Sequence, residues 1–339
     1  MPVGRLSIAC LLAATAAMLG CAVSPEVPRA EISNGLVHAK LYLPNSERGY
    51  YRGSRFDWSG VIATLEYKHH SFFGVWFPHY DPLLHDAITG PVEEFRSGPG
   101  QGIPLGFDEA KPRGGFVKVG VGVLRKPDDS PYSFSRTYDV VNPGIWTSRP
   151  SADRVEFEQD LKDDLGYSYR YEKTVRLVAR RPELVLEHRL KNTGAKVIET
   201  DVYNHDFYVL DAMPTGPPVT VKFAFEPKVE NDPSAPAGLN GFAEIRGNDL
   251  VFLKTLQEGE SAHTLLTGFG SQLSDNDIRV ENTQAGIGVR EIGDRPLVKL
   301  NFWSIRTTVC PEAYIHIKIA PGQEFRWSIR YVFYELPEK

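Results

Sequence analysis

A succession of short alternating segments is the feature that most limits how this chain can fold. From about Gly115 onward, apolar or aromatic residues recur at every second position in one run after another, and turn residues separate the runs. A period of two is that of a β-strand with one buried face and one wet face. The pattern predicts strands over residues 119–124, 132–140, 154–158, 167–178, 183–191, 197–203, 219–225, 250–253, 297–303, 313–319 and 325–334.

Strands this numerous predict an all-β fold, specifically a large antiparallel β-sandwich. Convincing stretches with the 3.6-residue period of a helix are absent, and only short helical turns are expected, at residues 81–87 and 160–164. Residues 77–114 and 211–218 interrupt the strand pattern, and in a β-sandwich function tends to lie in such excursions. Because sandwiches can exceed the usual domain length, we expect a single domain over residues 34–339.

The N-terminus has the pattern of an export signal. Arg5 supplies a positive start, and residues 8–19 form an apolar run too short to span a bilayer as a mature helix. The motif Met18-Leu19-Gly20-Cys21 resembles the lipobox of bacterial lipoproteins, in which cleavage leaves a cysteine that is then acylated. We therefore predict a lipoprotein-type signal peptide over residues 1–21, lipidation of Cys21, and a tether over residues 22–33. An ordinary signal peptide, cut near Ala14-Thr15-Ala16-Ala17, remains the alternative.

This N-terminus predicts an exported protein that is periplasmic or anchored to the outer membrane, with a lipid as its only contact with the membrane. The formal net charge is -5, and acidic and basic residues are interspersed without a basic run, so a nucleic acid is not an expected partner. Cys310 is the only cysteine left for the folded part, because Cys10 and Cys21 lie in the signal. No intramolecular disulfide is therefore available. The oligomeric state stays open.

The first candidate for chemistry is the polar cluster in residues 200–210. Alternation places Tyr203, His205 and Phe207 on one face of a strand and Asn204 and Asp206 on the other. A titratable imidazole is thereby expected among aromatic rings on a buried, concave side. The alternative is a core histidine that is satisfied by a backbone carbonyl.

The second candidate is Glu312, which follows Pro311 at the start of a predicted strand and has an aromatic residue nearby. Partial burial in such a place tunes the protonation of a carboxyl group. Any surface strand can begin with a glutamate, so this feature alone does not identify a site.

Together the two segments resemble the galactose mutarotase-like superfamily, and in particular the aldose 1-epimerases. Residues 203–208 resemble the Asn-His-x-(Tyr/Phe)-Phe segment of that family, whose histidine is the general acid. Residues 310–313, with Pro321-Gly322 and the final strand through Tyr331, look like the closing region that carries the general base. The resemblance implies a mutarotase-like supersandwich in which His205 is the acid and Glu312 the base. The family's Leu-His-Gly-Gly segment has only a loose substitute here, at residues 84–86.

The reaction that the resemblance implies is the opening of a cyclic aldose, with interconversion of its anomers. One group protonates the ring oxygen while another removes the proton of the anomeric hydroxyl, and an imidazolium and a carboxylate on opposite sides of the sugar supply both. No cofactor is required. The segment 50–60 resembles the one in which a mutarotase arginine contacts sugar hydroxyls, and we assign that role to Arg55 before Arg52. The expected substrate-binding residues are Arg55, His85, Tyr203, Asn204 and Asp206.

Two other kinds of function remain open. One is a lyase or hydrolase of oligosaccharides on the same fold, which a wide groove lined by Arg and Lys would favour. The other is a non-catalytic surface protein that captures sugar, in which the two titratable groups would be separated or screened. No metal is expected, although His79, His85 and Glu93 together offer nitrogen and oxygen ligands at short spacing.

Overall fold

The computed structural model describes residues 26–96, 102–230 and 238–337. The predicted signal peptide, Cys21 and the start of the predicted tether lie outside these residues. The described part contains 23 β-strands and one 3-10 turn, Leu273–Asp275, and no α-helix. The prediction of an all-β fold is confirmed. Within the described ranges no helix is long and apolar enough to cross a membrane.

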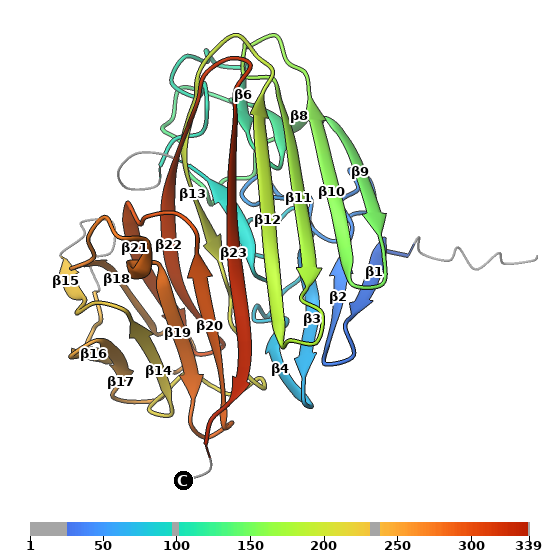
Figure 1. Ribbon diagram of the computed structural model, residues 1–339. Coiled ribbons are helices and arrows are strands. Elements are labelled where there is room, and N and C mark those ends of the chain that lie inside the picture. Colours follow the sequence, from blue (N-terminus) through green and yellow to red (C-terminus); the bar gives the residue numbers. More distant parts are fainter. Residues whose placement is uncertain (1–25, 97–101, 231–237, 338–339) are drawn as a thin grey trace, which may run out of the picture.

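One layer of the molecule is a ten-stranded sheet in which all neighbours are antiparallel (Figure 1). Its order is β16 (Ala243–Arg246), β17 (Asp249–Phe252), β14 (Val219–Phe223), β19 (Asp277–Asn282), β20 (Ile287–Gly293), β23 (Glu324–Glu335), β12 (Glu183–Asn192), β11 (Tyr169–Leu177), β10 (Arg154–Leu161) and β9 (Ile145–Pro150). The long strands β12 and β23 run side by side through its centre. The sheet thus joins a block of four consecutive strands, β9 to β12, to a block of later strands through the pairing of β12 with β23.

The facing layer consists of two smaller sheets. One has the order β15 (Lys228–Glu230), β18 (Ser261–Thr267), β21 (Lys299–Ile305), β22 (Thr308–Ile319), β13 (Ile198–His205) and β5 (Val92–Phe95). The other contains β1 (Arg29–Ser33), β2 (Val37–Tyr42), β3 (Val61–Tyr67) and β4 (His70–Phe73). Tyr208 joins the two sheets, because it forms bridges to both Phe73 and Val309. A three-stranded sheet of β6 (Gly115–Lys118), β7 (Gly122–Arg125) and β8 (Val140–Asn142) lies at the top of Figure 1.

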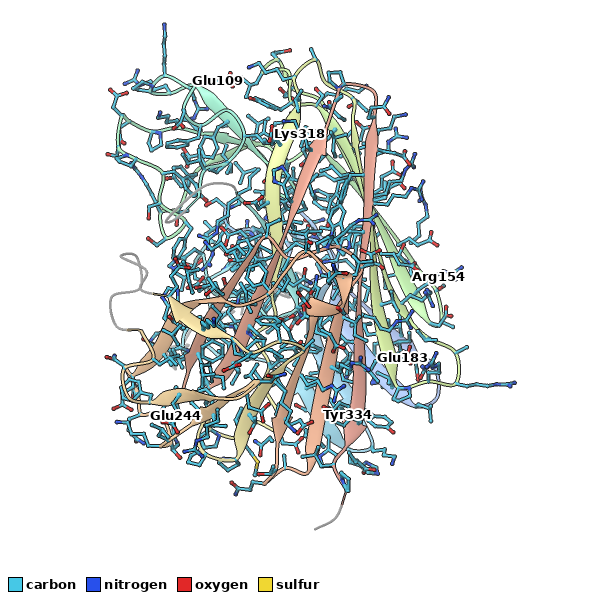
Figure 2. The ribbon with its side chains drawn as sticks, turned by 60° about the vertical axis from the view of Figure 1, so that its left-hand side comes forward. Glu109, Arg154, Glu183, Glu244, Lys318 and Tyr334 are labelled. Carbon is cyan, nitrogen blue, oxygen red and sulfur yellow. The ribbon has the colours of Figure 1, made fainter. Side chains whose placement is uncertain are left out.

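The main hydrophobic core fills the space between the two layers, while Glu109 and Arg154 lie at the periphery (Figure 2). It joins residues of the four-stranded sheet, such as Leu65 and Phe72, to residues of the ten-stranded sheet, such as Leu186 and Phe333. A separate aromatic cluster includes Phe56, Phe116, Phe207 and Cys310 together with loop residues. Burial of these large rings is the dominant favourable contribution to folding. The second cluster also builds the surroundings of His205.

Several details of the predicted fold are wrong. Residues 132–140 were expected to be a strand, but nearly all of them form a loop, whose Tyr132 and Tyr138 stack 5.5 Å apart beside Phe107. The alternating aromatic residues of this segment pack in that cluster and do not belong to a sheet. Residues 160 and 161 continue β10, so no helical turn begins there. Residues 81–87 form two successive turns without a helix. The predicted tether extends too far, since residues 29–33 are β1.

Candidate active site

The structure brings His205 and Glu312 together from distant parts of the sequence. His205 is the last residue of β13, and Glu312 lies in the neighbouring strand β22, where Val202 and Ile315 are paired in antiparallel register. The distance between His205 Nε2 and Glu312 Oε1 is 3.4 Å, and both side chains are at least 95% buried. The two groups therefore stand side by side. We expected the two groups on opposite sides of the sugar. The structure instead places them next to each other.

Neighbouring strands hold the Glu312 carboxylate in place. Asn301, directly opposite on β21, donates from Nδ2 to Oε2 at 2.9 Å, and the Tyr314 hydroxyl donates to the same oxygen at 3.1 Å. Burial alone would raise the pKa of Glu312, but His205, Arg96 and the Asn301 amide outweigh it and hold this pKa below its ordinary value. The carboxylate is ionised at neutral pH, with Oε1 turned toward His205.

Aromatic rings enclose His205. Phe207 stacks on the imidazole with centroids 3.8 Å apart, and Phe56 and Trp303 meet it edge-on at 5.6 and 5.4 Å. This burial lowers the pKa of His205 to about 4, although the Glu312 carboxylate acts in the opposite direction. At pH 7 the imidazole is neutral, which corrects the expected imidazolium. Among the described residues its Nδ1 is buried without a hydrogen-bond partner.

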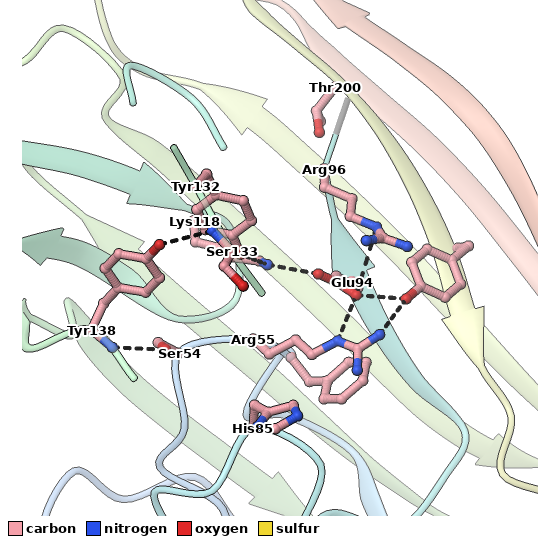
Figure 3. Close-up of polar contacts among 12 residues, drawn as sticks. Ser54, Arg55, His85, Glu94, Arg96, Lys118, Tyr132, Ser133, Tyr138 and Thr200 are labelled. Atoms are coloured by element: carbon pink, nitrogen blue, oxygen red, sulfur yellow. Dashed lines mark hydrogen bonds and ion pairs between the residues drawn. The ribbon is translucent and has the colours of Figure 1, made fainter. Parts of the chain in front are cut away.

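A buried cluster of charges around Glu94 forms the next part of the site (Figure 3). The Arg55 guanidinium donates from Nε to Glu94 Oε2 at 2.9 Å, and the Lys118 ammonium donates to Oε1 at 2.9 Å. The Tyr203 hydroxyl donates to Oε2 at 2.5 Å, and Arg96 Nε lies 3.8 Å from that oxygen. Burial would raise the pKa of Glu94, but these cations hold it well below its ordinary value. Glu94 thus anchors Arg55 and Tyr203 as a unit.

Arg55 and His85 meet through Asp86. The Arg55 guanidinium forms an ion pair with Asp86 through one of its nitrogens. Its central carbon, Cζ, lies over the Phe134 ring, 4.1 Å from the ring centroid. His85 Nε2 lies 3.2 Å from Asp86 Oδ2, and the His85 ring is 5.9 Å from that of Phe134. Like His205, His85 has a buried Nδ1 that has no partner among the described residues. Both histidines therefore have a buried ring nitrogen whose hydrogen-bonding capacity is not used by the described residues.

Hydrogen bonds and stacked rings connect the two halves of the site. Arg96 donates from Nη2 to the Tyr314 hydroxyl at 2.8 Å, and Tyr314 donates in turn to Glu312. The Tyr203 and Tyr314 rings stack 4.2 Å apart, and Tyr203 lies 6.0 Å from His205. Arg55, Tyr203, His205 and Glu312 therefore belong to one continuous, largely buried assembly.

Asn204 and Asp206 lie on the opposite face of the chain from His205. Asn204 Nδ2 donates to the Tyr331 hydroxyl at 3.1 Å, and the Tyr331 hydroxyl donates to Asp206 Oδ1 at 2.9 Å. Both side chains are buried between the two layers. The alternation predicted for residues 203–207 agrees with this placement. The placement disagrees with the prediction that Asn204 and Asp206 contact the substrate, because neither side chain faces the imidazole.

Glu93 also lies on the interior face, where it is buried. Its carboxylate forms an ion pair with Lys173 and lies 2.7 Å from His188 Nε2, and all three side chains are fully buried. His79, by contrast, lies in an exposed loop. The metal alternative of His79, His85 and Glu93 is therefore not assembled. Within the described ranges, no group of three or more His, Cys, Asp or Glu side chains is arranged to hold a metal ion.

Asp206 and Glu291 should make stability fall as the pH rises. Burial raises the pKa of Glu291 to about 7, and burial together with Glu291 raises the pKa of Asp206 well above its ordinary value. Both pKa values are higher in the folded state than in the unfolded chain. The stabilising contribution of Glu291 is therefore complete below about pH 4 and is lost as the pH rises through about 7, and that of Asp206 is lost at higher pH. The lowered pKa of His205 acts in the opposite direction over this range, so the contribution of Glu291 is measured against a variant that lacks its carboxyl group. Between pH 5.5 and pH 8 we expect urea denaturation to show the free energy of unfolding of the wild type falling by roughly 2 kcal/mol relative to that variant.

The matched variant for that measurement is Glu291→Gln, which keeps the shape and removes one titrating group. The decline between pH 5.5 and pH 8 should then become smaller. An equal decline in wild type and variant would assign the pH dependence to other groups.

Sequence reasoning missed several residues of this site: Phe56, Asp86, Glu94, Arg96, Lys118, Phe134, Asn301 and Tyr314. Glu94 carries a signal, since it adjoins Glu93 in an excursion from the strand pattern. Tyr314 also carries a signal, because it follows Glu312 by two residues and alternation along β22 puts both side chains on one face. Asn301 carries none, because only the register of β21 and β22 makes it a neighbour of the carboxylate.

No protein-family model matches the sequence, and no curated protein matches it. Solved structures do. The Slr1438 protein of Synechocystis sp. PCC 6803 is similar with a TM-score of 0.57 and 12% identity, over 94% of this chain and 100% of that one. The chain shares the fold of that protein over nearly its whole length.

Two further solved structures with this fold are described as aldose epimerases or their homologues. A GalM/aldose epimerase homologue from C. elegans has a TM-score of 0.57 and 13% identity, and it covers 92% of this chain and 100% of its own. A putative aldose 1-epimerase from Escherichia coli has a TM-score of 0.55 and 11% identity, again over 92% and 100%. The predicted mutarotase-like architecture is confirmed by these three similarities.

Proposed function

We propose that this protein is an aldose 1-epimerase, an isomerase that interconverts the anomers of an aldose by general acid–base catalysis. The observation that carries the proposal is the adjacency of His205 and Glu312, 3.4 Å apart in a buried aromatic site. Opening a cyclic hemiacetal moves one proton from the anomeric hydroxyl to the ring oxygen. Both oxygens are attached to the same carbon, so two titratable groups side by side can reach both of them.

The resting protonation states suggest the route of the proton. Glu312 is ionised and His205 is neutral at pH 7, as their lowered pKa values indicate. Glu312 takes the proton of the anomeric hydroxyl and passes it to Nε2 of His205. The imidazolium then protonates the ring oxygen as the bond from that oxygen to the anomeric carbon breaks, which leaves an aldehyde. Rotation of the aldehyde and reversal of these steps give the other anomer, with no net change in the enzyme.

Arg55, His85 and Tyr203 are the proposed contacts to sugar hydroxyls. Glu94 and Asp86 hold the Arg55 guanidinium, which fixes its direction before a ligand arrives. The unpartnered Nδ1 of His85 supports a hydroxyl contact there. Trp303 is partly exposed and meets His205 edge-on, so its ring is placed to cover an apolar face of a sugar.

This proton route makes a prediction about the dependence of the rate on pH. The free enzyme must contain neutral His205 and ionised Glu312, so kcat/KM for mutarotation should fall below about pH 4 to 5 and be level from pH 6 to 8. Polarimetry across that range, corrected for the uncatalysed rate, measures it. A rate that falls steadily from pH 4 to pH 7 would instead require a resting imidazolium, and the route through Glu312 would be wrong.

The direct test of the function uses freshly dissolved α-D-glucose and α-D-galactose with the purified protein. Polarimetry or NMR should show the approach to anomeric equilibrium accelerated in proportion to enzyme concentration. If no aldose responds, the epimerase proposal fails. The adjacency of His205 and Glu312 supports catalysis over simple sugar capture, for which separated groups were expected. Arg55 and Lys118 are buried against Glu94, which does not favour a lyase that presents cations to an acidic polysaccharide.

We also propose that the protein is exported and anchored through a lipid on Cys21, on the basis of the sequence pattern described above. Labelling of growing cells with a radioactive fatty acid tests this. Cys21→Ser should abolish the label, and a label that survives would point to another site of modification.

A further inference from the structure

We propose that Phe207 and Trp76 are positioning residues, which hold the His205 imidazole in a parallel stack of three rings so that its Nε2 faces Glu312. The inference deepens the proposed function and rests on it for its catalytic meaning. The stack itself stands on geometry. The His205 and Phe207 centroids are 3.8 Å apart at an interplanar angle of 8°, and the Phe207 and Trp76 centroids are 4.5 Å apart at 11°.

An unusual backbone conformation makes the first stacking contact. Phe207 has a φ of +46°, in the left-handed region that a residue with a Cβ atom rarely occupies. In a regular strand, side chains two residues apart on one face are about 7 Å apart, too far to stack. The left-handed turn brings the Phe207 ring onto the imidazole instead. The backbone N–H of Phe207 donates to Cys310 Sγ at 3.2 Å. The next residue, Tyr208, forms β-bridges to Phe73 on one side and to Val309 on the other.

Trp76 is fixed independently of Phe207. Its indole Nε1 donates to the Ile88 carbonyl at 2.8 Å, and its own carbonyl accepts from the Thr307 hydroxyl at 2.7 Å. These partners belong to the segment before β5 and to the turn between β21 and β22. Trp76 therefore cannot move away from Phe207 without breaking contacts to two separate parts of the chain.

The stack leaves the imidazole little freedom. Phe207 covers one face of the ring, and Phe56 and Trp303 stand against it edge-on at 5.6 and 5.4 Å. In the described residues no partner of Nδ1 fixes the ring orientation, as a second hydrogen bond commonly does for a catalytic histidine. Flat apolar surfaces perform that task here. Their second effect is the burial that lowers the pKa of His205 to about 4.

The test compares Phe207→Leu and Trp76→Leu with the conservative variants Phe207→Tyr and Trp76→Phe. The matched control is Phe302→Leu, which loses an equally buried ring on β21 that is 6.2 Å from Phe252 in the main core. NMR titration of the imidazole C–H signals, with His205→Ala to identify the His205 signal, measures its pKa. Polarimetry gives kcat and KM on the same proteins.

We expect both Leu variants to raise the pKa of His205 toward 6.5, because water gains access to the ring. They should also lower kcat by about 10- to 100-fold with KM changed less than about twofold, since a misplaced reacting group costs turnover more than binding. The Tyr and Phe variants should restore both values, and Phe302→Leu should alter neither.

A pKa of His205 unchanged in the Leu variants, or shifted as much by Phe302→Leu, would overturn the inference. The titration needs no turnover, so it separates this outcome from failure of the proposed function. If no aldose is converted but the pKa responds as expected, the stack still positions the histidine, and only the reaction has been misidentified.

Discussion

Glu312→Gln should reduce kcat for mutarotation by about 10²- to 10⁴-fold, the usual contribution of a general acid or base. The amide keeps the size of the side chain, and its oxygen can still accept the hydrogen bonds of Asn301 and Tyr314. What it loses is the ability to take the proton of the anomeric hydroxyl. KM should change little, because Glu312 acts on the reacting atoms. Initial rates by polarimetry at pH 7, over a range of sugar concentrations, separate kcat from KM.

The control for this variant is Glu187→Gln, the same chemical change at a half-exposed glutamate paired with Arg176 on the large sheet. It should retain wild-type kcat. His205→Ala should match the loss seen in Glu312→Gln, and the double variant should be hardly slower than either single one, because the two groups move the same proton. Losses that simply multiply in the double variant would mean that the two residues act in separate steps.

The outline of the fold could be predicted because most of its later strands bury one face only. The inward-facing positions of β11 alternate along the strand, and four of them are Tyr169, Tyr171, Lys173 and Val175. Three of these four residues are apolar or aromatic, so the sequence shows the period of two at those positions. Lys173 hides the pattern locally, since its charge is neutralised inside by Glu93. Of the early strands, β1 and β2 also alternate and could have been recognised, whereas β3 and β4 do not, because buried residues follow one another in them.

The candidate site could be predicted only where a single strand carries its residues. Alternation placed Tyr203 and His205 on one face and Asn204 and Asp206 on the other, and the structure has them so. It could not say which face meets the ligand and which meets the other sheet. That choice depends on the pairing of β13 with β5, which sets Asn204 opposite Glu93 in the sandwich interior. The resemblance to aldose 1-epimerases identified His205 and Glu312, whose pairing no periodicity could reveal.

Two consecutive residues of β5 divide their functions in the same way. Glu94 faces the site and holds Arg55, while Glu93 faces the interior and holds Lys173 and His188. Because the two carboxylates share one short stretch of backbone, the interior network limits how far Glu94 and its partners can move. The buried charges beneath the site thus contribute to the preorganisation above it.

Lys173→Met should be among the most destabilising single changes in this protein. Removal of the ammonium leaves Glu93 buried with only His188 and a weaker contact to Asn204, and breaking a buried ion pair costs about 3 to 5 kcal/mol. Arg176→Met is the matched control on the same strand, because Arg176 pairs at the surface with Glu187 and should cost less than about 1 kcal/mol. Urea denaturation at pH 7 measures both. A loss below about 1 kcal/mol in Lys173→Met would show that the interior charges are not mutually dependent, and the coupling between the two faces of β5 would have to be abandoned.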